Sequence, residues 1–431
     1  MSVHPLETFL ADCHAVRTTG ANAPETSFYA ALSTLFNEVG RHLKPKVRCV
    51  MGLKDQGAGM PDGGLFTESQ FGTRRDQMPL PGQMPERGVI EVKPVGADLA
   101  KLAATEQVVR YWTRYRLVLV TDLREFALLG EEGGATVVRE RYRLADTTSD
   151  FWELARHPHK AAIEQGVRFE EFVRRVILHA APLVDPKDVA WFLASYARDA
   201  RARVEGAALP ALDALRSALE QALGVKFEGD KGEHFFRSTL VQTLFYGVFA
   251  SWVLWHRAGG KDRFDWHNAA WSLRVPMIRA LFEQIAVPSK LRPLGLEEPL
   301  SLTAATLNRI ARAEFFKRFD DRHAVQYFYE PFLEAFDPEL RKQLGVWYTP
   351  EEIVRYMVRR VDQVLVSELG IADGLADPQV YVLDPCCGTG AYLVETLAVI
   401  GERLKAKGTD ALAATILRPD ARIYVGRSAL C

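Results

Sequence analysis

The chain has 431 residues, of which 48% are hydrophobic and 25% are charged, as is ordinary for a globular protein of roughly two to four domains. Its net charge of −1 excludes nucleic-acid binding through overall charge, so such binding would need local basic patches. The five cysteines show neither Cys-x-x-Cys pairs nor regular spacing, which argues against a disulfide framework or a zinc site. No signal peptide begins the chain, and its most apolar stretch, residues 240–255, is too short to predict a membrane span. We therefore expect a cytoplasmic protein with no membrane partner.

The first 150 residues predict a mixed α/β domain. Residues 24–43 have the apolar spacing of an amphipathic helix, and glycine-rich turns follow at 57–64. A loop is predicted over 71–87 and a short strand with alternating side chains over 89–94. Residues 117–121 and 125–129 then predict a strand and its hairpin partner.

Three charged residues in this region have the chemistry of a phosphodiester-cleaving site. Asp62 and Glu91 could hold one or two magnesium ions through oxygen ligands, which would activate a water molecule. Lys93 lies on the same strand face as Glu91, two residues away, and could orient that water or offset charge on the phosphate. The competing interpretation is that Glu91 and Lys93 form the solvated face of an edge strand.

Pro61-Asp62 followed by Glu91-x-Lys93 resembles the Pro-Asp…Asp/Glu-x-Lys nuclease superfamily. Downstream, Gln107-Val-Val-Arg-Tyr111 resembles the Gln-x-x-x-Tyr helix motif of its restriction-type branch, and the spacing puts both side chains on one helix face. The resemblance implies magnesium-dependent DNA cleavage. The implied catalytic residues are Asp62, Glu91, Lys93, Gln107 and Tyr111, and the implied metal ligands are Asp62, Glu91 and Glu25, an acid early in the first predicted helix.

Residues 151–345 predict a helical region. Periodic stretches occur at 169–179, 189–204, 212–223, 235–255 and 301–319, and no phosphate-binding loop of an ATP-driven motor is present. The segment 241–250 is apolar almost all round, which predicts a buried central helix without a catalytic residue. It also resembles the Gln-Thr-x-x-Tyr-Gly-x-Phe helix in the coupler of single-chain restriction–modification enzymes.

The segment from Val382 to Leu393 predicts a buried strand, a tight turn with two glycines and a helix. Asp384 at the strand end would repel a phosphate but would suit a ligand with an amino group or hydroxyls, such as S-adenosylmethionine. Alone, a Gly-x-Gly turn is weak evidence for a cofactor. Upstream, Pro350 begins a helix whose predicted buried stripe is Ile353, Met357, Val361 and Val364.

Two motifs of this last region, Tyr348-Thr349-Pro350 and the run from Asp384 to Gly390, resemble those of the amino-methylating adenine DNA methyltransferases. The resemblance implies S-adenosylmethionine as cofactor. The implied cofactor-binding residues are Tyr348, Thr349, Pro350, Asp384, Pro385, Cys387, Gly388 and Gly390.

The chain also departs from that family. A second strand is predicted at 422–425, but Gly426 and Arg427 follow it where the family has an acid for the ribose hydroxyls. The Asn/Asp-Pro-Pro-aromatic motif that holds a flipped adenine is absent, as is a target-recognition domain. We therefore expect a C-terminally truncated protein that does not transfer methyl groups by itself.

Together these patterns predict an α/β multidomain chain. Its expected parts are a nuclease-like α/β domain at 1–150, an all-α connector at 151–345 and the start of a Rossmann-like methyltransferase at 346–431. The predicted function is that of a single-chain restriction–modification enzyme of type IIG or type ISP that acts on double-stranded DNA, with a homodimer as the form for double-strand cleavage. Two alternatives stay open: a non-catalytic DNA-binding remnant, and a free-standing magnesium-dependent nuclease with a cofactor sensor.

Overall fold

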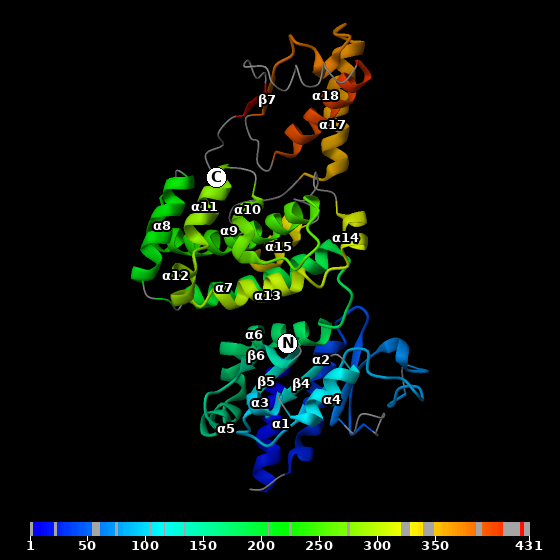
Figure 1. Ribbon diagram of the computed structural model, residues 1–431, viewed down its shortest axis with the longest axis vertical. Helices are drawn as coiled ribbons and strands as arrows, with labels where there is room; N and C mark the ends of the chain where they lie inside the picture. Colours follow the sequence, from blue (N-terminus) through cyan, green and yellow to red (C-terminus); the bar gives the residue numbers. More distant parts are fainter. Residues whose placement is uncertain are drawn as a thin grey trace. The chain divides into compact units, whose positions relative to one another are not determined.

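The chain divides into two compact units, Met1–Pro182 and Leu183–Cys431 (Figure 1). The computed structural model describes residues 3–20, 24–53, 61–73, 76–103, 105–115, 117–132, 135–205, 207, 209–223, 226–273, 276–319, 328–338, 349–384, 390–407 and 423–425. Within these ranges, no helix has the length and apolar character needed to cross a membrane.

A six-stranded sheet in the order β1-β2-β3-β4-β5-β6 forms the centre of the first unit. All neighbouring strands are antiparallel except β3 and β4, which run parallel. The strands are β1 (Val47–Met51), β2 (Gly63–Thr67), β3 (Val89–Val92), β4 (Val118–Thr121), β5 (Glu125–Glu132) and β6 (Ala135–Arg143).

Helices cover both faces of this sheet because its strands alternate their side chains between two apolar cores. Ile90 and Val92 enter the core shared with α1, α2, α5 and α6, whereas Val89 and Val118 enter the core shared with α3 and α4. The helical segments are α1 (Pro5–Thr19), η1 (Glu25–Phe28), α2 (Tyr29–Gly40), η2 (Glu68–Gln70), α3 (Leu99–Ala103), α4 (Glu106–Tyr115), α5 (Thr148–Arg156) and α6 (Pro158–Leu178).

The strands predicted at 89–94, 117–121 and 125–129 are confirmed as β3, β4 and β5. The edge-strand interpretation of Glu91 is wrong, because β3 lies between β2 and β4 and Glu91 is only 2% exposed. The end of the predicted glycine-rich turn is in fact strand, since Gly63 and Gly64 begin β2. Helices α5 and α6 pack in the first unit, which extends past residue 150; the three-domain division stays a prediction.

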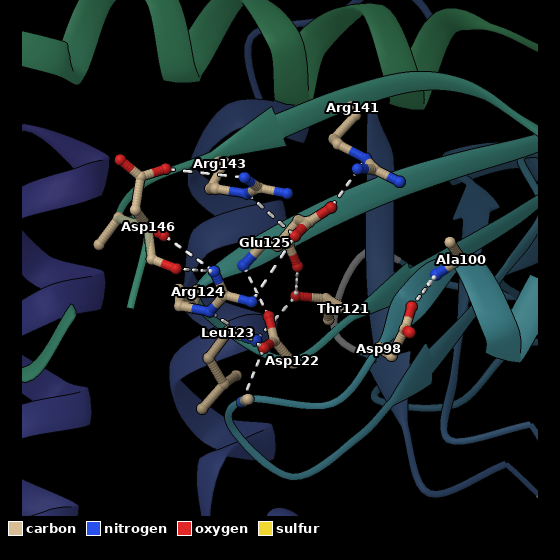
Figure 2. Close-up of polar contacts among 12 residues, drawn as sticks. Asp98, Ala100, Thr121, Asp122, Leu123, Arg124, Glu125, Arg141, Arg143 and Asp146 are labelled. Atoms are coloured by element: carbon tan, nitrogen blue, oxygen red, sulfur yellow. Dashed lines mark hydrogen bonds and ion pairs between the residues drawn. The ribbon is translucent and has the colours of Figure 1, made fainter. Parts of the chain in front are cut away.

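The turn between β4 and β5 is held together by a buried carboxylate (Figure 2). Asp122 accepts hydrogen bonds from the backbone N–H groups of Glu125, at 2.7 Å, and of Gly96, at 2.8 Å. Glu125 in turn lies 2.8 Å from Arg141 and 3.2 Å from Arg143 of β6. These contacts tie the segment that follows β3 to the β5–β6 hairpin.

In the second unit, the described residues up to 338 form helices around α9. Residues 241–250 of α9 are mostly buried, which confirms the predicted central helix, and Gly247 leaves the space that the ring of Phe282 fills. The helical segments are α7 (Pro186–Glu205), α8 (Leu209–Leu223), α9 (Gly229–Arg257), η3 (Trp266–Asn268), α10 (Ala269–Ser272), α11 (Pro276–Ile285), α12 (Pro288–Leu291), η4 (Arg292–Leu294), α13 (Glu297–Leu307), α14 (Arg312–Arg318) and α15 (Glu330–Phe336).

The single helix predicted at 301–319 is wrong, because α13 ends at Leu307 and α14 begins at Arg312. The residues between them bond elsewhere. The side chain of Asn308 pairs with both backbone groups of Phe264, at 2.9 and 2.8 Å, and the N–H of Ala311 bonds to the carbonyl of Leu183. These tertiary bonds replace the helical ones.

The described residues from 349 onward form α17 (Glu351–Ser367), η7 (Gly374–Ala376), β7 (Val382–Asp384), α18 (Ala391–Lys407) and β8 (Ile423–Val425). Strands β7 and β8 pair in parallel, which confirms the predicted second strand. Asp362 of α17 forms an ion pair with Arg403 of α18 at 2.6 Å and accepts the N–H of Leu375.

The predicted buried stripe on α17 is wrong for Ile353, Met357 and Val361, which are about half exposed. The helix instead buries Val354 and Val358, which form one apolar cluster with Leu375 and Val399. The prediction of a buried strand at β7 is also wrong, since Leu383 is 66% exposed. Among the described residues, only β8 pairs with β7.

Candidate active site

The β2–β3 pairing brings two carboxylates together within the first sheet. Gly63 pairs with Ile90 in antiparallel register, so the preceding residue, Asp62, comes opposite Glu91. Asp62 Oδ2 accepts the backbone N–H of Val92 at 2.7 Å, and Oδ1 accepts the hydroxyl of Tyr29 at the start of α2. The aspartate is thus fixed from both sides.

Glu91 is bound by its own strand and by α4. Its Oε1 accepts hydrogen bonds from Lys93 Nζ at 2.7 Å and from Gln107 Nε2 at 3.1 Å. Gln107 Nε2 also lies 3.0 Å from the hydroxyl of Tyr111, one turn further along the same helix face. The sheet and α4 therefore bring four of the predicted residues into one hydrogen-bonded group.

The charges of this group influence one another. Burial raises the pKa of Glu91, the hydrogen bond from Lys93 opposes that rise, and the charges of Asp62 and Glu25 add to it. Burial acts to lower the pKa of Lys93, but its hydrogen bond to Glu91 and the surrounding acids outweigh burial and raise it. An excess of negative charge at a half-buried site is an environment that favours a cation.

The residues present fit a magnesium ion in part. Glu91 Oε2 is a buried acceptor without a hydrogen-bond partner among the described residues, as expected of a carboxylate oxygen that binds a cation. Magnesium commonly takes one or two carboxylates and keeps several waters. No trio of His, Cys, Asp or Glu side chains in the described ranges is arranged to hold a metal, so the three-ligand set Asp62, Glu91 and Glu25 is not assembled.

Glu25 and Tyr29 also act on this group, from η1 and α2. Glu25 in η1 acts on Glu91 and Lys93 through its charge, without a direct hydrogen bond to Asp62 or Glu91. Tyr29 was not among the predicted site residues, although it follows Glu25 by four positions and so faces the same way on a helix. Burial, followed by the hydrogen bond to Asp62, raises the pKa of Tyr29 above its ordinary range.

Four of the eight predicted cofactor-binding residues lie in the described ranges. Thr349 and Pro350 precede α17, Asp384 ends β7, and Gly390 precedes α18 with a left-handed φ of 80°. A backbone in that region favours glycine, as the motif requires. Tyr348, Pro385, Cys387 and Gly388 lie outside the described residues.

A cavity of about 430 Å³ adjoins Asp384. Apolar side chains of α17, β7 and α18 form most of its wall, with Met357, Tyr381 and Tyr392 among them. One carboxylate beside an apolar and aromatic wall suits a ligand that joins an ammonium or hydroxyl group to a ring system. This chemistry fits S-adenosylmethionine.

Residues 320–414 match the family model of N-6 DNA methylases. The matched segment contains Thr349, Asp384 and Gly390 and confirms that the methylase resemblance of this region extends beyond the two short motifs. A search of curated proteins found no match.

Two solved structures share a weak overall likeness with the chain. The cryoEM structure of a DrdV–DNA complex is 20% identical, with a TM-score of 0.35, over 98% of this chain and 36% of that one. The ATP-dependent type ISP restriction–modification enzyme LlaBIII bound to DNA is 15% identical, with a TM-score of 0.31, over 78% of this chain and 21% of that one. This chain thus spans about a third of the first structure's chain and about a fifth of the second. The family match covers residues 320–414 and is to the N-6 DNA methylases.

Proposed function

We propose that this chain belongs to a restriction–modification enzyme and cleaves double-stranded DNA with magnesium at Asp62, Glu91 and Lys93. The observation that carries the proposal is the position of Glu91. It is a buried carboxylate on an internal strand, with Lys93 and Gln107 on one oxygen and no partner among the described residues on the other. Burying such a carboxylate costs free energy. Groups of this kind are therefore found mainly where function needs them.

Each side chain has a defined task in this proposal. Magnesium, when bound by Asp62 and Glu91, would polarise the phosphodiester and make water a better nucleophile. Lys93 would place its ammonium against the charge that develops on the phosphate. Gln107 donates to Glu91 Oε1 and so keeps Oε2 directed away from α4, while Tyr111 holds the Gln107 amide in place.

The test is cleavage of a supercoiled plasmid in magnesium by the full chain. Lys93→Ala and Glu91→Gln should each lower the rate by at least about a hundredfold, because each removes a charge from the reacting centre. Lys101→Ala is the matched control, since Lys101 is exposed on α3 and pairs only loosely with Asp98. Equal cleavage by wild type and Lys93→Ala would refute the proposal.

We further propose that residues 349–390 bind S-adenosylmethionine and that the segment belongs to a DNA adenine methyltransferase. The match of residues 320–414 to the N-6 DNA methylases supports this. Calorimetric titration with S-adenosylmethionine should show binding by wild type and at least about tenfold weaker binding by Asp384→Ala; the same affinity for both would count against the assignment.

A further inference from the structure

A second pocket lies beside the candidate active site. Its volume is about 260 Å³, and its wall combines side chains of α1, η1, α5 and the segment after β3. Lys93 and Glu25, which belong to the charged group around Glu91, line it together with Arg17, Phe28, Leu123 and Trp152. A ligand in this pocket would therefore touch the same lysine as a phosphate at the active site.

The pocket combines cations with an aromatic floor. The guanidinium of Arg17 lies 4.3 Å from the ring centroid of Trp152, and the rings of Phe151 and Phe28 lie 4.9 and 6.1 Å from that of Trp152. Stacking on an aromatic face holds a guanidinium while leaving its N–H groups free for a planar or tetrahedral anion. Among the described residues no ion pair joins Arg17 to a carboxylate, and the acid in the pocket wall is Glu25.

Leu123, which also lines the pocket, has a strained backbone. Leu123 has a left-handed φ of 70°, and it is the one non-glycine residue with positive φ in the described part of the chain. The strain is held in place by the Asp122 turn and by a hydrogen bond from the Leu123 N–H to Thr121 Oγ1 at 3.0 Å. Strain of this kind persists where the surroundings enforce it, and it clusters at ligand sites.

We infer that this pocket binds the sugar–phosphate of the nucleotide next to the cleaved phosphodiester. Arg17 contacts its phosphate, Lys93 is shared with the cleaved one, and the apolar wall of Phe28 and Leu123 packs on the sugar. A polymer with one phosphate per nucleotide is the ligand that can fill both places at once. The inference rests on the proposed cleavage of DNA and adds to it a residue that binds substrate outside the metal site.

The experiment measures binding of a short fluorescent DNA duplex to the full chain in EDTA, where cleavage is prevented, over a series of salt concentrations. Arg17→Gln should weaken binding about three- to tenfold and lower the slope of log affinity against log salt by about one, because one phosphate contact is lost. Arg41→Gln is the control. Arg41 is an exposed arginine that follows α2 and pairs with Glu38, outside the pocket.

The outcomes separate this inference from the proposed function. Unchanged affinity and slope in Arg17→Gln would overturn the pocket, and so would failure of the wild-type chain to bind the duplex. If Arg17→Gln weakens binding while wild type does not cleave in magnesium, the pocket stands as a DNA contact and the proposed cleavage fails. If wild type cleaves and Arg17→Gln raises KM with kcat little changed, both stand.

Discussion

Two hydrogen bonds fix the carboxylate of Asp62, one from the backbone of Val92 and one from the hydroxyl of Tyr29. The first comes from the sheet itself and cannot be removed by substituting a side chain. The second comes from α2 and can. Tyr29 is therefore a positioning residue whose contribution to the site can be measured separately from that of the acids.

Tyr29→Phe should lower plasmid cleavage about tenfold, because a hydrogen bond to a charged carboxylate is worth about 1.5 kcal/mol. The loss should be larger at low magnesium than at saturating magnesium, since a loosely held Asp62 binds the ion less well. A purely structural role would give the same loss at both concentrations. Tyr356→Phe, which removes an exposed hydroxyl on α17, should change neither rate.

At the residue scale, the sequence identifies the acids and the lysine through their spacing but gives no indication of Tyr29 as a partner of Asp62. The reason is distance along the chain. Gln107 and Tyr111 are related by a helical period that can be read locally, whereas Tyr29 and Asp62 are 33 residues apart and meet only after β1 and β2 have paired. The catalytic roles of Asp62, Glu91, Lys93, Gln107 and Tyr111 stay predictions.

At the scale of elements, β3 determines most of the first unit. It pairs with β2 on one side and β4 on the other, and its residues enter both cores. Gly88 immediately before it has a φ of 94°, and a Cβ there would lie 2.3 Å from Leu117 Cδ2 and 2.6 Å from the Leu117 carbonyl oxygen. The position directly before β3 therefore accommodates glycine and no residue with a Cβ.

Gly88→Ala should destabilise the first unit by about 3 kcal/mol, from left-handed strain together with the clash. Gly82→Ala provides the control, because Gly82 also has a positive φ but nothing lies within 4 Å of its Cβ position. It should cost only about 1 kcal/mol. Hydrogen exchange of peptides from β3 and β4 measures both values, and similar losses in the two variants would contradict the role given to Leu117.

The contribution of Asp122 to the free energy of unfolding depends on pH. Burial is the main effect and raises the pKa of Asp122 above 3.8, although the N–H groups of Gly96 and Glu125 and the charge of Arg124 oppose the rise. The folded protein then holds this proton more tightly than the unfolded chain, so the stability that Asp122 confers falls as pH rises from 3.8 through the folded pKa.

Asp122→Asn should remove this pH-dependent part. In urea unfolding between about pH 4 and about pH 7, the stability of wild type relative to the variant should decline with rising pH. The variant also loses one of the two side-chain oxygens that accept a backbone N–H, which lowers its stability by about 1 kcal/mol at every pH and leaves the slope unchanged. A difference between the two proteins that does not vary with pH would show that the carboxyl does not titrate in this range.

The helices α17 and α1 show which features of an element the sequence did not predict. Two apolar stripes compete on α17, and the one that the sequence favours, through Ile353, Met357 and Val361, is left exposed. Amphipathic patterns tell which faces avoid water but not which neighbour covers them. The helix α1 is absent from the predicted elements, although its buried residues Leu6, Phe9, Leu10 and Cys13 have the spacing of an amphipathic helix.

For the molecule as a whole, each of the two compact units buries apolar residues of its own. In the second, Asp337 is a buried junction of three helices. Its Oδ2 accepts from Arg201 of α7 at 2.8 Å and from Ser238 of α9 at 2.9 Å, directly after the end of α15. No periodic pattern predicts such a junction, because its partners are 136 and 99 residues away along the chain.

Asp337→Ala should destabilise the second unit by about 3 kcal/mol, because Arg201 and Ser238 lose their shared buried acceptor and Arg201 keeps only Glu205 among the described carboxylates, at 3.5 Å. Plasmid cleavage at low temperature should be unchanged, since the candidate active site lies wholly in the first unit. Asp213→Ala, at an exposed position of α8, is the control. Hydrogen exchange should show the loss in α7 and α9 peptides; an equal loss in β3 would mean that the two units unfold together.

The internal position of β3 also bears on how activity can be lost. The amides of Val92 and Lys93 bond to Asp62 and to the carbonyl of Thr121, so the ladder that closes the sheet also carries the candidate catalytic side chains. Sites built on loops can open by local fluctuation while the core persists, but here opening the site means opening the sheet. The proposed cleavage activity should persist as denaturant rises and then be lost together with protection of the slowest-exchanging amides, with no partly active form in between.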